Sequence, residues 1–195
     1  MIPVLLVHGI WDSAARLDPL KSGLEQRGVP VVRAMNLVPS DGRASIRELA
    51  DLVASEARAF AAEQKAERID LVGFSMGALV SRVFLHRCGG KERVRRFVSI
   101  SGPHHGTWSA FALPLRGVRD MRPRSALLRD LEDDRDPFGA VDVHCVYTPF
   151  DLMILPPKSS VLPTARSVRA IPIPMHRFMI SDARVLDHVA SILRA

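Results

Sequence analysis

The feature that most constrains the fold of this chain is the sequence G-F-S-M-G at residues 73–77. The apolar run 69–72 before it predicts a buried strand, and apolar residues at 79, 80, 83 and 84 after it predict a helix. A serine on a sharp turn between a strand and a helix stands clear of its own backbone, and small neighbours avoid a clash there. The pattern therefore predicts a nucleophile elbow built around Ser75, rather than a structural glycine turn.

The rest of the chain alternates between strand patterns and helix patterns. Strands are predicted at residues 2–7, 29–34, 69–72, 94–100, 141–147 and 168–173. Helices are predicted at 17–26, at 46–60 with Ser45 or Asp41 as its cap, after the elbow, at 125–131, and from about 182 to the end. Such alternation is typical of a mostly parallel central sheet with helices on both faces. We expect one domain over residues 1–195, which is long enough for one substantial core.

A second motif, His8-Gly9-Ile10, directly follows the first predicted strand. Acyl transfer builds negative charge on the substrate oxygen, and two backbone N–H groups usually stabilise that charge. We expect one N–H from Met76, the residue after the nucleophile, and the other from Ile10, with Gly9 allowing a close approach. His8 is interpreted as a structural residue that shapes this loop, because in this arrangement the base follows the nucleophile along the chain.

The base is expected after the nucleophile and the acid, in the order Ser, Asp or Glu, His. His176 lies between the last predicted strand and the last helix, which is where the base belongs. His144 lies inside a strand and His188 on the final helix, and both are interpreted as packing residues. His104 and His105 follow a strand end, but choosing either would require an unusual arrangement of the acid.

For the acid, the prediction is Asp151, in the loop after the strand that ends at Tyr147. Its apolar neighbours would keep it partly desolvated, where a carboxylate can orient an imidazole and stabilise its charged form. Asp142 begins a strand, and residues 133–136 form a polar run that is interpreted as solvated surface.

Residues 102–138 show no regular pattern apart from the short predicted helix, and long connections of this kind often form lids or substrate walls. Whether this segment is a mobile lid stays open at the level of sequence. The walls of an acyl site are predicted from four large apolar residues near the motifs, each of which could equally be ordinary packing: Trp11, Trp108, Phe111 and Leu155.

Composition argues against several classes of protein. The chain has 195 residues, 47% of them hydrophobic and 25% charged, which is typical of globular proteins and excludes a disordered one. Its net charge of +6 is interpreted as a solvated face, and no nucleic-acid module accompanies it, so no nucleic-acid partner is expected. The two cysteines, at 88 and 145, lack metal-site spacing and are predicted to be buried thiols; no metal and no cofactor are expected.

No apolar run approaches the roughly 20 residues of a membrane-spanning helix. The apolar opening at residues 2–7 is too short for a signal-peptide core and lacks a basic lead-in. We therefore expect a cytoplasmic protein.

At this point the motifs resemble a known group, the small bacterial lipases and esterases of the α/β-hydrolase superfamily. Residues 3–10 look like their first strand and oxyanion loop, 69–79 like their elbow, 101–107 like their Pro-His-x-Gly segment, and 150–154 and 175–181 like their acid and histidine loops. The resemblance implies an α/β-hydrolase fold with a small or absent lid and a triad of Ser75, Asp151 and His176, with Ile10 and Met76 as oxyanion donors. Phe74 departs from it, because many lipases carry His before the nucleophile.

The resemblance implies a serine hydrolase that cleaves carboxylic esters, an esterase or lipase acting on a small-molecule ester or lipid, with transient contact to a lipid surface as a further option. An acyltransferase would use the same triad, and a non-catalytic binding protein could share the fold. A peptidase is less favoured, because the chain has little room for a substrate-gating domain. The sequence makes no prediction of oligomeric state.

Overall fold

The fold is built on one six-stranded sheet in which every strand runs parallel to its neighbours. The structure is a computed structural model, and it describes residues 2–195. The strand order is β2-β1-β3-β4-β5-β6, so the chain adds strands first on one side of β1 and then on the other. The strands are β1 (Val4–Val7), β2 (Val32–Met35), β3 (Ile69–Phe74), β4 (Val94–Ile100), β5 (Asp142–Tyr147) and β6 (Ser167–Ala170).

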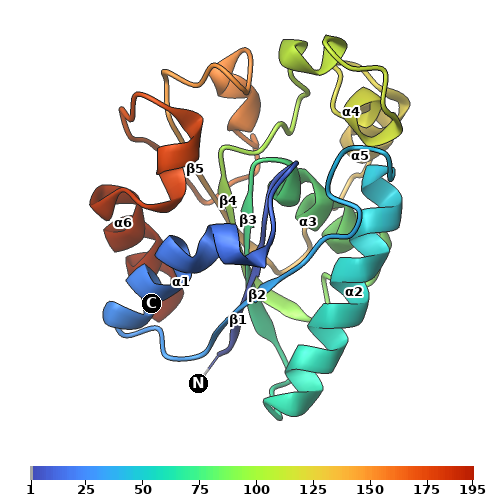
Figure 1. Cartoon of the computed structure of the whole chain (residues 1–195). Coiled ribbons are helices and arrows are strands. Elements are labelled where there is room, and N and C mark those ends of the chain that lie inside the picture. Colours follow the sequence, from blue (N-terminus) through green and yellow to red (C-terminus); the bar gives the residue numbers. More distant parts are fainter. Residues whose placement is uncertain (1) are drawn as a thin grey trace.

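Helices cover both faces of this sheet, as Figure 1 shows. Helices α1 and α6 lie together on one face, and α2 and α3 lie on the other, with α4 and α5 beyond them (Figure 1). The α-helices are α1 (Asp18–Gln26), α2 (Ile46–Glu63), α3 (Met76–Arg87), α4 (Arg116–Asp120), α5 (Ala126–Glu132) and α6 (Ala183–Arg194). Short 3₁₀ turns are η1 (Ala14–Leu17), η2 (Trp108–Phe111), η3 (Pro157–Ser160) and η4 (His176–Ile180).

The two faces of the sheet carry separate apolar cores. Along β1, Leu5 and Val7 pack under α2 and α3, whereas Val4 and Leu6 pack under α1 and α6. Successive strand side chains point to opposite faces, so a strand that is apolar at every position is buried on both sides. This confirms the interpretation of the uninterrupted apolar run at the start of the chain.

The predicted elements are confirmed, with two strands shifted by proline. The strand predicted at 29–34 begins only at Val32, because Pro30 has no N–H to donate to a ladder. The strand predicted at 168–173 is observed at Ser167–Ala170, and Pro172 follows its end. At the start of α2, Ser45 forms the cap, and its side chain and that of Glu48 each accept from the other's backbone N–H.

The segment 102–138 packs against the core through buried apolar side chains. It contains η2, α4 and α5, and Val118, Leu128 and Leu131 are buried among the residues of α2 and α3. Its outer side exposes Trp108 and Phe111, whose rings stack with centroids 5.5 Å apart. The predicted helix at 125–131 is confirmed as α5, capped by Ser125.

Two further findings concern membrane-spanning helices and the cysteines. Within residues 2–195, no helix is both long and apolar enough to cross a membrane. Cys88 and Cys145 are both unbridged; Cys145 is buried, as predicted, but Cys88 is only half-buried. The Cys88 thiol lies 3.5 Å from the Asp51 carboxylate at the surface of α2 and α3.

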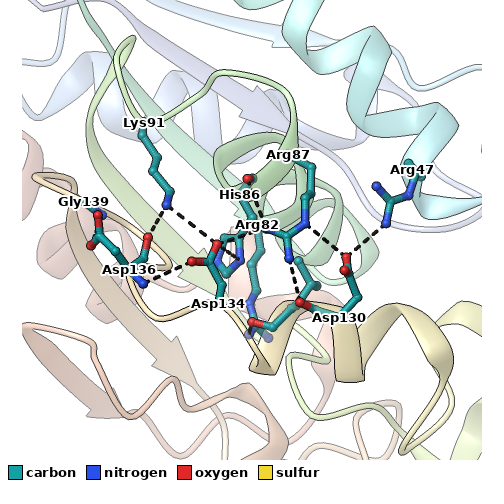
Figure 2. A network of polar contacts seen from close by, with 10 residues as sticks. Arg47, Arg82, His86, Arg87, Lys91, Asp130, Asp134, Asp136 and Gly139 are labelled. Carbon is teal, nitrogen blue, oxygen red and sulfur yellow. Dashed lines mark hydrogen bonds and ion pairs between the residues drawn. The ribbon is translucent and has the colours of Figure 1, made fainter.

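A network of charged groups joins the end of α3 to the segment after α5 (Figure 2). Arg87 donates to the carboxylates of Asp130 and Asp134, and Lys91 donates to the backbone oxygen of Asp136. The Arg82 guanidinium is buried deeper and donates to the backbone oxygen of Leu131. These contacts fix α5 and the chain that follows it to α3 and to the turn after α3.

His86 lies within this network without a hydrogen bond to either ring nitrogen (Figure 2). Its Nδ1 is 3.5 Å from the Asp134 carboxylate, and its ring meets the edge of Phe138 at 4.9 Å. Burial lowers the pKa of His86 to about 3, and the neighbouring positive charges act in the same direction. His86 is therefore neutral in the folded protein at every pH near neutrality.

This burial predicts a loss of stability in mild acid. Below pH 6.5 His86 becomes protonated in the unfolded chain but stays neutral in the folded one. The free energy of unfolding therefore decreases as the pH is lowered from 6.5 to about 3. At about pH 5 this one group contributes a loss of about 2 kcal/mol. The variant His86→Leu is expected to show a correspondingly shallower loss between about pH 7 and pH 5 in urea unfolding. Identical pH dependence in both proteins would contradict this.

Candidate active site

The candidate site lies where the order of strands reverses, at the carboxyl edge of β1 and β3. The register pairs Val7 of β1 with Gly73 of β3, so the residues that follow the two strands leave the sheet side by side. In open parallel sheets this reversal point is the usual position of a ligand crevice. Parallel pairing therefore brings the His8-Gly9-Ile10 loop next to Ser75, although the two loops are far apart in the sequence.

Ser75 occupies the strained corner that the sequence predicted. Its backbone has φ 55° and ψ −127°, a left-handed conformation that side chains other than glycine seldom adopt. Its N–H donates to the Ile100 carbonyl of β4 at 2.9 Å, which holds the corner to the sheet. A Cβ at Gly77 would lie 2.3 Å from the His8 oxygen, and one at Gly73 would lie 2.5 Å from the Ala78 Cα, so neither position has room for a side chain.

The loop after β1 approaches the nucleophile equally closely. A Cβ on Gly9 would lie 3.0 Å from the Ser75 Cβ and 3.4 Å from its Oγ. The Ile10 N–H donates to no group within residues 2–195. Met76 is the first residue of α3, where backbone N–H groups have no partner within the helix. The two residues predicted as oxyanion donors, Ile10 and Met76, thus directly follow Gly9 and Ser75 in the chain.

His8 has a structural position, in agreement with its interpretation from sequence. Its side chain is fully buried, with Nδ1 2.8 Å from the Gly9 oxygen and Nε2 accepting from the Leu37 N–H at 2.9 Å. Burial lowers the pKa of His8 below its ordinary value. Both ring nitrogens are occupied by backbone groups, so the ring shapes the loop after β1.

The structure brings Asp151 and His176 together. Asp151 Oδ2 lies 2.7 Å from His176 Nδ1, and Asp151 Oδ1 accepts the N–H groups of Met153 and Ile154 at 2.9 Å each. The carboxylate is 1% exposed. The His176 ring packs on Phe74 at 4.9 Å, and its Nε2 is buried without a hydrogen-bond partner within residues 2–195. A carboxylate behind the imidazole and an unoccupied Nε2 in front of it are the arrangement that a general base requires.

Two threonines hold the loops that carry these side chains. Thr148 Oγ1 donates to the Ile173 oxygen and accepts the Ile173 and Phe150 N–H groups, which joins the acid loop to the histidine loop. Thr107 Oγ1 donates to the Met153 oxygen and accepts the Leu155 N–H. The acid loop is therefore fixed on both sides by buried hydroxyl groups.

A cavity of about 330 Å³ opens at Ser75 and His176. Most of its lining is apolar, which suits an acyl chain better than a sugar or a peptide. The polar groups besides Ser75 and His176 are Asp12, Arg16 and Arg177. The apolar lining residues are Ile10, Trp11, Phe74, Leu152, Met153, Pro174 and Met175.

Of the four residues predicted as walls of the acyl site, one lines the cavity and three do not. Trp11 lines the cavity, whereas Trp108, Phe111 and Leu155 do not. Trp108 and Phe111 stack on each other at the surface of 102–138, a segment that contributes no lining residue at all. Sequence reasoning missed the apolar neighbours of the triad, Leu152 and Met153 beside Asp151 and Pro174 and Met175 beside His176. Adjacency to the triad was the signal that could have found them.

The remaining histidines lie outside the cavity lining. His104 is fully buried with Nε2 2.7 Å from the Ser99 Oγ, and burial holds the pKa of His104 well below its ordinary value. His105 contacts Glu132 and the Val161 oxygen. His144 bonds Ser167 across β5 and β6.

Comparison with known proteins gives a family and several relatives. A model of the family described as palmitoyl protein thioesterase matches residues 3–133, which include the elbow and the loop after β1. Palmitoyl-protein thioesterase 3 of Dictyostelium discoideum is 28% identical over 113 residues, which are 53% of this chain and 36% of that protein. A triacylglycerol lipase of Pseudomonas fragi is 29% identical over 125 residues, 60% of this chain and 39% of that protein. The matches thus span well under half of the length of these curated relatives.

Solved structures share the fold at low sequence identity. The mature form of a Bacillus licheniformis lipase superposes with a TM-score of 0.82 at 15% identity, over 98% of this chain and 91% of that one. The predicted α/β-hydrolase fold is confirmed, and with it the resemblance to lipases and esterases.

The threonine that joins the acid and histidine loops predicts a measurable cost. Thr148→Val keeps the shape of the side chain but removes one donor and leaves buried backbone groups of Ile173 unpaired, so the free energy of unfolding is expected to fall by about 2–3 kcal/mol. Urea unfolding measures it, with Thr164→Val at an exposed position as the matched control. A loss no greater than that of the control would contradict the role given to Thr148.

Proposed function

The chain belongs to the palmitoyl protein thioesterase family, and from this we propose that it hydrolyses acyl esters or thioesters through an acyl-enzyme on Ser75. The observation that carries the proposal is the pairing of Asp151 with His176 at 2.7 Å, beside a strained serine that opens into an apolar cavity. No other histidine of residues 2–195 combines a buried carboxylate partner with a place in the lining of that cavity.

In this mechanism His176 Nε2 takes the proton of the Ser75 hydroxyl as Oγ attacks the acyl carbon. Asp151 accepts the hydrogen bond of Nδ1–H and stabilises the imidazolium that forms. His176 then gives its proton to the departing oxygen or sulfur, and the acyl group stays on Ser75. Water attacks this acyl-enzyme with His176 again acting as the base, and the carboxylic acid leaves.

The negative oxygen of each tetrahedral intermediate is stabilised by the N–H groups of Ile10 and Met76. Support comes from the close approach of the Gly9 loop to Ser75 and from the unpaired donors at Ile10 and at the start of α3. One such donor typically contributes about 3 kcal/mol to the stability of the transition state.

The cavity supports an acyl group of short or medium length. Its volume of about 330 Å³ lies near the lower end of the range for small-molecule sites. Trp11, Leu152 and Met175 are exposed at its rim, so a longer chain would continue out of it along an apolar surface. We expect shorter acyl chains to react faster than palmitoyl chains.

The central test is the Ser75→Ala variant on p-nitrophenyl acetate, butyrate, octanoate and palmitate, and on the matching thioesters. The wild type is expected to hydrolyse butyrate and octanoate fastest, and the variant to lose activity by a factor on the order of 10⁵, because its hydroxyl nucleophile is gone. A fluorophosphonate probe should label the wild type at Ser75 and leave the variant unlabelled. Adding an alcohol and analysing the products separates hydrolysis from acyl transfer. Equal activity in both proteins would refute the proposal.

Asp151→Asn tests the acid separately from the nucleophile. The Asn oxygen can still accept the Met153 and Ile154 N–H groups, so the loop is retained, but its amide no longer stabilises a charged His176. We expect kcat to fall by a factor on the order of 10⁴. The matched control is Asp18→Asn, on the exposed side of α1, which should retain wild-type activity. Retention of a tenth or more of kcat by Asp151→Asn would show that another group supports the base.

A further inference from the structure

Two arginines stand at the border between the acyl cavity and a second hollow. Arg16 comes from η1, after the loop that follows β1, and Arg177 directly follows His176 in η4. Both line the cavity at Ser75, and both also line a neighbouring hollow of about 230 Å³. The remaining lining of that hollow is Pro19, Phe178, Ile180 and Ser181. The two hollows therefore share two lining residues, Arg16 and Arg177.

These guanidinium groups are poorly neutralised by the protein. Arg16 faces one carboxylate, that of Asp12, with Nε 3.8 Å from Oδ1. Arg177 lies over the Phe178 ring at 4.9 Å, and no carboxylate of residues 2–195 forms an ion pair with it. By contrast, Arg33 and Arg87 are each paired with two carboxylates. The border of the cavity thus carries two positive charges against one negative charge.

The position of the reacting bond decides which part of a substrate meets these arginines. The acyl carbon must lie at Ser75, with the acyl chain against the apolar lining, so the leaving group has to extend elsewhere. Arg177, which lines the second hollow, directly follows His176, the residue that would protonate the leaving group. A leaving group that departs on this side of His176 therefore enters the hollow that Arg16 and Arg177 line.

Resting on the function proposed above, we propose that Arg16 and Arg177 form a subsite for a phosphate group carried by the alcohol or thiol that leaves. A guanidinium presents a planar fork of N–H donors that matches phosphate oxygens, and two such forks can hold one phosphate from two sides. The subsite makes the enzyme selective for phosphorylated leaving groups over neutral ones with the same acyl chain. Asp12 competes with the phosphate for Arg16 and limits that selectivity.

The test compares substrate pairs that differ in the phosphate and share the reacting bond. For a thiol leaving group the pair is octanoyl phosphopantetheine, the acylated thiol arm of coenzyme A, and octanoyl pantetheine; for an alcohol it is octanoylglycerol phosphate and octanoylglycerol. The measured quantity is the ratio of kcat/KM for the phosphorylated to the neutral member. In the double variant Arg16→Gln with Arg177→Gln this ratio is expected to fall about tenfold, mainly through KM. Asp12→Asn is expected to raise it, because Arg16 loses its only carboxylate.

Arg58→Gln is the matched control, since it removes the same charge from an exposed position on α2 away from both hollows. Its ratio should equal that of the wild type. A ratio that stays unchanged in the double variant, or that falls equally in Arg58→Gln, overturns the subsite and leaves only long-range attraction. If the ratio of kcat/KM falls in the double variant for only one substrate pair, that pair identifies the leaving group as a coenzyme A thiol or as a glycerol alcohol.

A binding measurement separates this inference from the proposed chemistry. Calorimetric titration with coenzyme A and with glycerol phosphate needs no turnover, and binding to the wild type should weaken about tenfold in the double variant and not in Arg58→Gln. If no substrate is cleaved but this difference is found, the hydrolase proposal fails and the phosphate subsite stands. If the substrates are cleaved and neither product binds through the arginines, the subsite fails and the hydrolase stands.

Discussion

The parallel pairing of β1 with β3 is the constraint on which the rest of the site depends. It sets two loops side by side at the carboxyl edge of the sheet, and their close approach leaves no room for a side chain at Gly77 and little at Gly9. The strain at Ser75 is sustained by this crowding, because the corner is enclosed by Val7 and His8 on one side and tied to Ile100 on the other. The most closely packed part of the site thus lies at the Ser75 corner.

Asp151 and His176, the proposed acid and base, are positioned in a different way. They lie in long loops after β5 and β6, where no ladder fixes the backbone, and buried hydroxyl groups replace it. Thr148 spans the two loops, and Thr107 joins the acid loop to the chain after β4. Since each such hydroxyl both donates and accepts, these loops satisfy their polar backbone groups without regular structure. Ser75 is positioned by the sheet, whereas Asp151 and His176 are positioned by side chains.

Much of this could be predicted from sequence, because it depends on local rules. The elbow follows from glycines flanking a serine between a strand and a helix, and the pairing of Asp151 with His176 follows from chain order and loop position. Strand ends were less predictable, since Pro30 and Pro172 remove N–H groups without marking where pairing starts or stops. The cavity wall was the least predictable part. The aromatic rings of Trp108 and Phe111 stack on each other at the surface and do not line the cavity, and the spacing of residues in the sequence does not predict such packing.

The placement of residues 102–138 has a consequence for how a ligand reaches the serine. This segment is anchored through Val118, Leu128 and Leu131 and borders no part of the cavity, so it need not swing aside before binding. Where a flap must open first, affinity is reduced by the fraction of molecules that are already open. That reduction does not arise from this segment, because the cavity at Ser75 is lined entirely by residues outside it.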